Sequence, residues 1–290
     1  MNELKYERPT SVDDAIACMG MAGARALAGG SDLIPQLREG RRVAGVVVDL
    51  KHVPALVEIA STPDGGWRIG AAASVTKMRR HEAFFSAHRA LVDSACLIGS
   101  LQVQARASLG GNLCNAAPSA DGVPLLIALG AEAEIHGPGG IRRAPAEAVP
   151  TGPGRTSLSP GELLVALHLP PRVKRSADRY LRFTPRREMD IAVAGAGVRI
   201  DLDDRGAISV ARVVLASVGP VPVRAKSAEA LLVGQLPTAR LLEYAGASAA
   251  QECTPISDTR GTAAYRRDLV AVLTRRALAD CAGRLGVFLS

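Results

Sequence analysis

The sequence predicts an α+β protein with two domains. Its 290 residues exceed the ~100 to 200 residues of a typical single domain. Hydrophobic residues make up 48% of the chain and charged residues 22%, which is the balance of a soluble globular protein with a sizeable interior. Strand and helix patterns are mixed in the first part of the chain, whereas the last part has two strand patterns followed by three helical ones. A boundary is expected near Pro170-Pro171.

The first elements expected are a helix, a strand and a second helix. Apolar residues recur at helical spacing over 11–19, and Ser11 is placed to cap the start of that helix. A strand pattern over 24–28 leads into Gly29-Gly30-Ser31-Asp32, and a helix-compatible stretch over 33–38 follows. Further elements expected before residue 100 are strands at 46–48 and 67–71 and helices at 75–81 and 84–98.

A second glycine-rich segment, Ser108-Leu109-Gly110-Gly111-Asn112, is expected to form a loop, with a helix over the apolar run 123–129. Proline and glycine are dense between 137 and 161, which predicts exposed turns around a short strand, and a strand resumes at 163–169. Beyond the boundary, the expected elements are strands at 191–200 and 210–218 and helices at 225–233, 238–250 and 262–285.

The chain shows no sign of export or membrane insertion. No stretch approaches the ~18 apolar residues of a membrane helix, and residues 1–14 carry polar and charged side chains where a signal peptide is apolar. The five cysteines lie far apart, with no C-x-x-C pair and no histidine at zinc spacing, so no zinc or iron–sulfur site is expected in this chain. These features favour reduced thiols and a cytoplasmic location.

The chain is basic, with a net charge of +7. Aromatic residues make up only 3% of it, and no recognition-helix or zinc-finger pattern is present. Docking to an acidic protein partner therefore fits better than binding to nucleic acid. The densest basic run extends over 172–187 and is opposed within it only by Asp178. Such a run is typical of a solvated face.

Several catalytic motifs are incomplete. His81-Glu82 begins like a zinc-protease helix motif, but Phe85 stands where the second histidine is required. No Walker A lysine follows a glycine loop. Gly195-Ala196-Gly197 lies inside a strand pattern, which does not support a dinucleotide fingerprint of the doubly wound type. The sequence therefore predicts neither a catalytic triad nor a metal site.

Two glycine-rich turns about 80 residues apart, Gly29-Gly30-Ser31-Asp32 and Gly110-Gly111-Asn112, are the main candidates for a ligand site. A diphosphate needs several backbone N–H donors, and glycine lets the main chain approach closely and turn successive amides toward one anion. Ser31 and Ser108 add hydroxyl donors, and the helix expected after Ser31 would direct its positive end toward the phosphates. Either glycine pair alone is more often a plain turn.

Taken together, the two segments resemble the FAD-binding medium subunit of the molybdenum hydroxylases, a family that includes carbon monoxide dehydrogenase and bacterial xanthine dehydrogenase. The resemblance covers nearly the full chain. The residues that carry it are Ala28-Gly29-Gly30-Ser31-Asp32-Leu33, Ser108-Leu109-Gly110-Gly111-Asn112-Leu113, Asn115-Ala116-Ala117-Pro118-Ser119-Ala120-Asp121, Pro124-Leu125-Leu126, Leu129-Gly130-Ala131, Glu162-Leu163-Leu164, Arg186-Arg187-Glu188, Asp190-Ile191-Ala192, Tyr265-Arg266-Arg267 and Arg275-Arg276-Ala277-Leu278.

The resemblance implies an α+β fold of the PCMH or vanillyl-alcohol-oxidase type. An FAD-binding domain would occupy residues 1–172, with subdomains of about 1–55 and 56–172 that hold FAD between them. A C-terminal medium-subunit domain of antiparallel sheet with helices would occupy residues 173–290.

The resemblance also implies which residues contact FAD. The two glycine loops would wrap the diphosphate and neighbouring ribityl atoms, and Asp121, Leu164 and Arg182 would add three further contacts. The full implied set is Leu27, Ala28, Gly29, Gly30, Ser31, Asp32, Leu33, Ile34, Ser108, Leu109, Gly110, Gly111, Asn112, Asp121, Leu164 and Arg182. Asp121 could instead be a carboxylate at the start of the following helix, and Leu164 a plain buried strand residue.

Two positions depart from the family pattern. Arg182 stands where the animal xanthine enzymes have a lysine, and Met189 replaces an acidic residue often found in that stretch. The arginine keeps a positive charge, and a cation near the flavin favours the anionic reduced form. Part of the basic run could therefore tune the flavin electrostatically or form a docking surface. The missing acidic residue at Met189 argues against nicotinamide-linked tuning of the flavin ring edge.

The function implied by the resemblance is electron transfer within a larger complex. A molybdopterin-binding large subunit would oxidise substrate, a [2Fe-2S] small subunit would relay the electrons, and FAD in this chain would pass them to a quinone, a nicotinamide or dioxygen. The complex would be a dimer of heterotrimers, and no residue here need be a general acid or base. Two alternatives stay open: an assembly subunit that has lost the cofactor, and a stand-alone FAD-dependent oxidoreductase.

Overall fold

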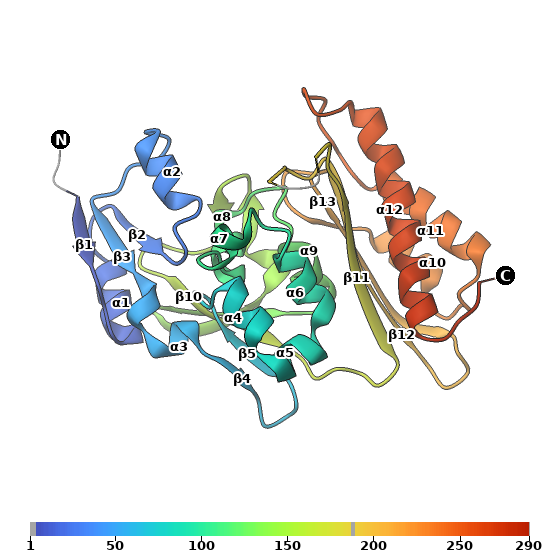
Figure 1. Ribbon diagram of the computed structural model, residues 1–290, viewed down its shortest axis with the longest axis horizontal. Helices are drawn as coiled ribbons and strands as arrows, with labels where there is room; N and C mark the ends of the chain where they lie inside the picture. Colours follow the sequence, from blue (N-terminus) through green and yellow to red (C-terminus); the bar gives the residue numbers. More distant parts are fainter. Residues whose placement is uncertain (1–3, 187–188, 290) are drawn as a thin grey trace.

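The computed structural model describes residues 4–186 and 189–289. The chain has the predicted α+β fold, and its three larger sheets follow one another across the molecule (Figure 1). The first is a parallel sheet with the order β1-β3-β2, formed by β1 (Lys5–Glu7), β2 (Ala24–Leu27) and β3 (Val46–Asp49). Two helices, α1 (Val12–Met19) and α2 (Leu33–Arg38), connect its strands. Ser11 caps α1 as predicted, because its side chain accepts a hydrogen bond from the Asp14 N–H.

The second sheet is antiparallel, with the order β4-β5-β10-β6-β7. Its strands are β4 (Ile59–Ser61), β5 (Trp67–Gly70), β6 (Glu132–Gly137), β7 (Gly140–Pro145) and the central β10 (Leu163–Leu169). Around it lie η1 (Leu50–His52), α3 (Pro54–Val57), α4 (Val75–Arg80), α5 (Glu82–Ala87), α6 (Arg89–Ala95), α7 (Leu101–Gln104), α8 (Leu109–Asn115), α9 (Val123–Ala128), η2 (Ala146–Ala148) and the small β8 (Pro150–Gly152) and β9 (Arg155–Thr156) pair.

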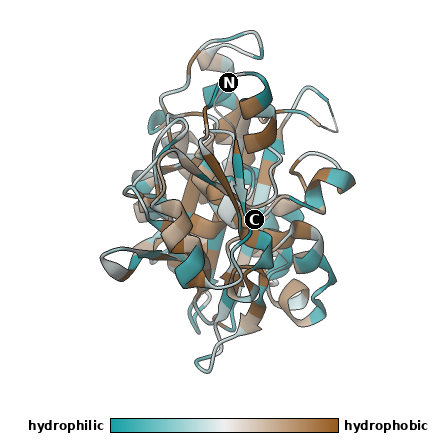
Figure 2. Ribbon diagram, turned by 90° about the vertical axis from the view of Figure 1, so that its left-hand side faces the viewer, coloured by the Kyte–Doolittle hydropathy of each residue, from teal (hydrophilic) through white to brown (hydrophobic). Residues whose placement is uncertain are grey.

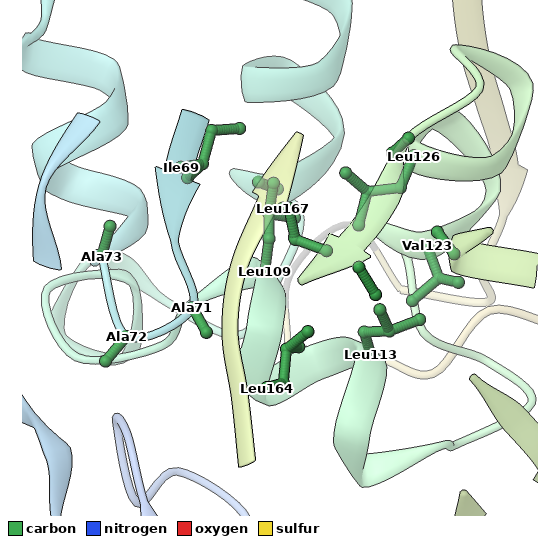
Figure 3. Packing of buried hydrophobic residues seen from close by; sticks show 14 of the residues in the cluster. Ile69, Ala71, Ala72, Ala73, Leu109, Leu113, Val123, Leu126, Leu164 and Leu167 are labelled. Atoms are coloured by element: carbon green, nitrogen blue, oxygen red, sulfur yellow. The ribbon is translucent and has the colours of Figure 1, made fainter. Parts of the chain in front are cut away.

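A hydrophobic core joins this second sheet to its helices. Figure 3 shows Leu109 of α8 beside Leu167 of β10, and Leu113 of α8 beside Val123 of α9. All four side chains are almost completely buried. Hydrophobic residues are concentrated toward the middle of the molecule, while hydrophilic ones dominate the outer loops (Figure 2).

The third sheet is antiparallel and follows the chain order, with β11 (Ser176–Phe183), β12 (Ala194–Leu202), β13 (Ile208–Ala216) and β14 (Val223–Arg224). Three helices, α10 (Lys226–Leu232), α11 (Ala239–Gln251) and α12 (Ala263–Arg284), pack on one side of it, and α9 approaches the other (Figure 1). A separate hydrophobic core fills the space between the sheet and α10–α12.

Two glycines of β12 lie in close contact with neighbouring elements. A β-carbon at Gly197 would lie 2.9 Å from Cβ of Pro124 in α9, and one at Gly195 would lie 3.0 Å from Cζ of Tyr180. Both positions therefore exclude larger residues. The Gly195-Ala196-Gly197 pattern is thus a packing feature of a strand, consistent with the absence of a dinucleotide fingerprint.

Four expectations from the sequence need correction. The segment 84–98 forms two helices because His88 takes a non-helical conformation between them. The region 137–161 contains three short strands rather than one. Part of the basic run forms β11, whose alternate side chains face the two packed sides, so Arg182 is buried instead of solvated. The second glycine-rich segment is the first turn of α8, since Ser108 caps a helix there.

All five cysteines are free thiols in the structure. Within residues 4–186 and 189–289, no helix has the length and apolar character needed to cross a membrane. The same residues contain no cluster of three or more side chains arranged to hold a metal ion.

Candidate functional site

A cavity of about 890 Å³ lies where the two glycine segments meet. This volume is within the ~300 to 1,000 Å³ range of small-molecule sites. The predicted residues that line it are Ala28, Gly29, Gly30, Ser31, Asp32, Leu33, Ser108, Gly110, Gly111, Asn112 and Leu164. The two segments, far apart in sequence, therefore share one cavity wall.

The first glycine segment follows β2, at the carboxyl end of a parallel sheet, where ligands bind in many α/β structures. Gly30 has φ +75°, a left-handed conformation that glycine adopts without strain. A β-carbon there would also lie 3.0 Å from Cδ1 of Leu27 and 3.1 Å from Cγ1 of Ile34. Leu27 and Ile34 thus support the loop from behind and do not line the cavity.

The second glycine segment is shaped by helix capping and by close packing. The Ser108 hydroxyl accepts a hydrogen bond of 3.1 Å from the Gly111 N–H. A β-carbon at Gly110 would lie 2.6 Å from Cα of Ala71, so the start of α8 packs directly on the chain that follows β5. Leu109 points into the core instead of the cavity.

The two glycine segments are in direct contact. A β-carbon at Gly29 would lie 2.5 Å from the carbonyl carbon of Arg106 and 2.8 Å from the Ala107 nitrogen. A β-carbon at Gly111 would lie 3.7 Å from Cβ of Ala28. At position 29, only glycine permits this approach of one backbone to another. The convergence expected from the sequence is present in the structure.

Several backbone donors at this junction have no protein acceptor. Among residues 4–186 and 189–289, none accepts a hydrogen bond from the N–H groups of Gly29, Gly30, Ser31 and Gly110. Gly29 and Gly30 are half-buried and Gly110 is buried, whereas Ser31 is exposed. Buried N–H groups are almost always paired with protein, water or ligand, so it is the three glycine amides that indicate a bound partner. Donors from two segments on one cavity wall form a site suited to an anion.

Apolar side chains line other parts of the same cavity, among them Met19, Leu50, Ile98, Leu158 and Leu164. Charged side chains of both signs reach it as well, from Arg25, Arg42, Asp32 and Glu162. A ligand with both an apolar ring and a phosphate-bearing part matches such a lining. Ile98 and Ala71 were not predicted as site residues, because isolated apolar residues outside a motif give no sequence signal for a ligand.

Two predicted site residues, Asp121 and Arg182, lie outside the cavity lining and form an ion pair with each other. Asp121 also accepts a 2.9 Å hydrogen bond from the Tyr180 hydroxyl. Burial raises the pKa of Asp121 to about 6, although Arg182 and the Tyr180 hydroxyl favour its ionised form. Asp121 directly precedes Gly122, the N-cap residue of α9, but its side chain makes no capping hydrogen bond to that helix.

One part of the resemblance cannot be placed. Arg187 and Glu188 lie outside the described residues. Their neighbour Met189 is exposed and has φ +50°, an uncommon conformation for a residue with a β-carbon.

Comparison with known proteins assigns both parts of the chain. Residues 2–172 match the FAD binding domain in molybdopterin dehydrogenase, and residues 179–281 match the CO dehydrogenase flavoprotein C-terminal domain. The chain therefore belongs to the family of FAD-binding medium subunits of the molybdopterin hydroxylases. It is a subunit of a dehydrogenase complex.

Individual relatives agree with this assignment. The chain is 31% identical to the xanthine dehydrogenase FAD-binding subunit of Escherichia coli O157:H7, over 97% of both chains. It is 32% identical to the carbon monoxide dehydrogenase medium chain of Afipia carboxidovorans, over 94% of both. The structure superimposes on a chain of carbon monoxide dehydrogenase from Hydrogenophaga pseudoflava with a TM-score of 0.92 and 29% identity, covering 97% of this chain and 98% of that one.

Proposed function

We propose that the cavity binds FAD and that the two glycine segments hold its diphosphate. The supporting observation is the set of unpaired N–H groups from Gly29, Gly30, Ser31 and Gly110 on one wall. A β-carbon at Gly29 or Gly110 would collide with neighbouring backbone, so glycine at these positions permits the close packing that brings the two segments together. The unpaired amides that this packing brings to one wall fit an anion.

In this proposal, backbone dipoles supply most of the attraction for the diphosphate. Arg25 and Arg42 are the basic residues of the lining, and Asp32 and Glu162 bring two opposing charges. The net charge of these four side chains is zero, so the amides carry the recognition. Leu164 and the other apolar lining residues would pack against the rings of the ligand.

The predicted roles of Asp121 and Arg182 have weaker support. Both are buried, pair with each other and lie beside the cavity instead of in its lining. We retain them as predicted cofactor residues. In the structure, the ion pair between them and the hydrogen bond from the Tyr180 hydroxyl to Asp121 link the loop before α9 to β11.

When bound, FAD would supply the redox chemistry, taking electrons from [2Fe-2S] clusters in a small subunit and passing them to an external acceptor. The chain's own residues would bind the cofactor, orient it and shield it from water. We further propose a molybdopterin-binding large subunit as the site of substrate oxidation, and a dimer of heterotrimers as the assembly. The medium-chain names of the carbon monoxide dehydrogenase relatives support a multi-subunit complex.

The division into an FAD-binding domain at 1–172, with subdomains of about 1–55 and 56–172, and a C-terminal domain at 173–290 is part of this proposal. Two separate hydrophobic cores support it. The five free cysteines support a reducing, cytoplasmic compartment.

Titration of the purified full-length chain with FAD tests the proposal. We expect one FAD per chain, with flavin absorbance that stays with the protein through gel filtration. A folded chain that binds no FAD would support the alternative of a cofactor-free assembly subunit. A chain that binds FAD and oxidises a substrate without molybdopterin or iron–sulfur subunits would support a stand-alone flavoenzyme.

A further inference from the structure

Lys51 contacts the first glycine segment without lining the cavity. Its Nζ donates a hydrogen bond of 2.9 Å to the carbonyl oxygen of Ala28. Lys51 belongs to η1, directly after β3, and does not line the cavity itself. No motif marks this lysine, and it is not among the residues implied by the family resemblance.

The Lys51 ammonium is fixed by a buried carboxylate. Asp49, which is 3% exposed, accepts hydrogen bonds from the Lys51 Nζ, from the Lys51 N–H at 3.1 Å and from the Tyr6 hydroxyl. Burial opposes ionisation of Asp49, but the hydrogen bonds from Lys51 and Tyr6 outweigh it and hold its pKa below the ordinary value. The carboxylate therefore stays charged and keeps the ammonium in place at neutral pH.

Because the peptide bond is planar, the contact at the Ala28 carbonyl also fixes the orientation of the Gly29 N–H. In a planar trans peptide the C=O and the N–H point in opposite directions. A lysine that fixes the Ala28 carbonyl thereby fixes the direction of the Gly29 N–H, one of the four unpaired donors. On the other side, Gly29 is held against Arg106 and Ala107. The Ala28–Gly29 peptide is thus held at both its carbonyl and its α-carbon.

We propose that Lys51 is a positioning residue, which orients the Ala28–Gly29 amide for the diphosphate of the bound nucleotide. This inference rests on the proposed function. The charge of Lys51 is balanced by Asp49, so its direct attraction for the phosphates is largely cancelled. Its effect on binding comes from the loop geometry.

The test compares Lys51→Met with Lys77→Met in the full-length chain. Lys77 is a matched control because its Nζ also donates to a backbone carbonyl, that of Val57 at 2.6 Å, and neither residue lines the cavity. The probes are FAD, ADP, which contains the diphosphate, and riboflavin, which lacks it. We expect Lys51→Met to weaken FAD and ADP binding by roughly 10-fold or more, because the misdirected Gly29 N–H would lose its hydrogen bond to a charged phosphate. Riboflavin binding should be unchanged, and Lys77→Met should match the wild type for all three probes.

Two further variants separate positioning from folding. Lys51→Met leaves the buried Asp49 without its cation, so the Asp49→Asn/Lys51→Met double variant removes that unpaired charge. It should fold and still bind ADP weakly, whereas Lys51→Arg, which keeps a donor, should restore part of the ADP affinity. If the wild type binds neither FAD nor ADP, the proposed function fails and this inference falls with it. If the wild type binds both and the folded Lys51 variants bind ADP equally tightly, or lose ADP and riboflavin in parallel, only the positioning role is overturned.

Discussion

The α-carbon of Gly29 lies against the carbonyl group of Arg106, so closely that a β-carbon would stand 2.5 Å from the carbonyl carbon. Gly29 begins the glycine turn after β2, and Arg106 lies two residues before Ser108, the capping residue of α8. Through this contact, two segments that are distant in the sequence form one wall of the cavity. The cavity, the unpaired amides and the proposed nucleotide site all depend on it.

Gly29→Ala should destabilise the protein, because the added methyl group has no space against Arg106 and Ala107. We expect a loss of about 1–3 kcal/mol in the free energy of unfolding, the usual cost of overpacking, together with weaker FAD binding. Urea unfolding measures the first effect. Gly139→Ala is the matched control, since a β-carbon at Gly139 would have no neighbour within 4 Å. Equal stability of the two variants would contradict the packing described here.

Gly111→Val should reduce FAD binding while leaving a folded chain. A β-carbon at Gly111 would lie 3.1 Å from Ser108 Oγ and 3.7 Å from Ala28 Cβ, so valine would extend along the cavity wall. We expect at least a roughly 10-fold loss of affinity with a small change in Tm, measured by FAD titration and thermal unfolding. Gly110→Val should instead unfold the region, because its β-carbon would meet Ala71 at 2.6 Å. Unchanged FAD affinity in Gly111→Val would argue against the second segment as a cofactor contact.

His88 should make the protein less stable in mild acid. Its ring is buried and neither nitrogen has a partner in the described part of the chain. Burial, with smaller effects from Arg172 and Arg199, lowers its pKa to about 4. The unfolded chain, with an ordinary histidine pKa of about 6.5, binds the proton more readily, so stability is full above pH 6.5 and falls as the pH drops toward 4.

The loss attributable to His88 over that range is on the order of 3 kcal/mol. His88→Leu should flatten the dependence of unfolding free energy on pH between 6.5 and 4. Urea unfolding at several pH values compares the two proteins, with pH 7.5 as the reference where His88 is neutral in both states. The same slope in both proteins would show that His88 is not the group responsible.

Arg182→Met should be strongly destabilising. It leaves the buried Asp121 carboxylate with only the Tyr180 hydroxyl as a partner. Removing one member of a buried pair costs about 3–5 kcal/mol. The Asp121→Asn/Arg182→Met double variant should recover part of this loss, because no unpaired charge remains. A cost below about 1 kcal/mol for Arg182→Met, measured by urea unfolding, would mean that the pair is solvated.

Local patterns in the sequence predicted much of the fold. The helix α2 and the strand β10 have the expected bounds. A glycine turn precedes the helix, and a largely apolar run, interrupted only by His168, marks the strand. The strand β11 was missed, because its arginines resemble a solvated face when tertiary partners are unknown. The start of α8 at Ser108 was also missed, because Gly110 and Gly111 have a low helix propensity. In the structure, the Ser108 cap and the packing of Gly110 on Ala71 stabilise the helix there.

The sequence predicted the parts of the candidate site in which backbone groups face the cavity. Glycine pairs mark close approach in the sequence itself, and both pairs line the cavity. Side chains that act through tertiary contacts gave no comparable signal. Lys51 reaches the Ala28 carbonyl only because β2 and β3 are neighbours, and the Asp121–Arg182 pair forms only when β11 packs beside α9.

Amide NMR spectra of the ¹⁵N-labelled chain, recorded without and with FAD, most directly test whether the two glycine segments hold the diphosphate. We predict that the amide signals of Gly29, Gly30 and Gly110 shift together on binding and that their hydrogens become protected from exchange. Binding of FAD that leaves these three signals unchanged would contradict the account.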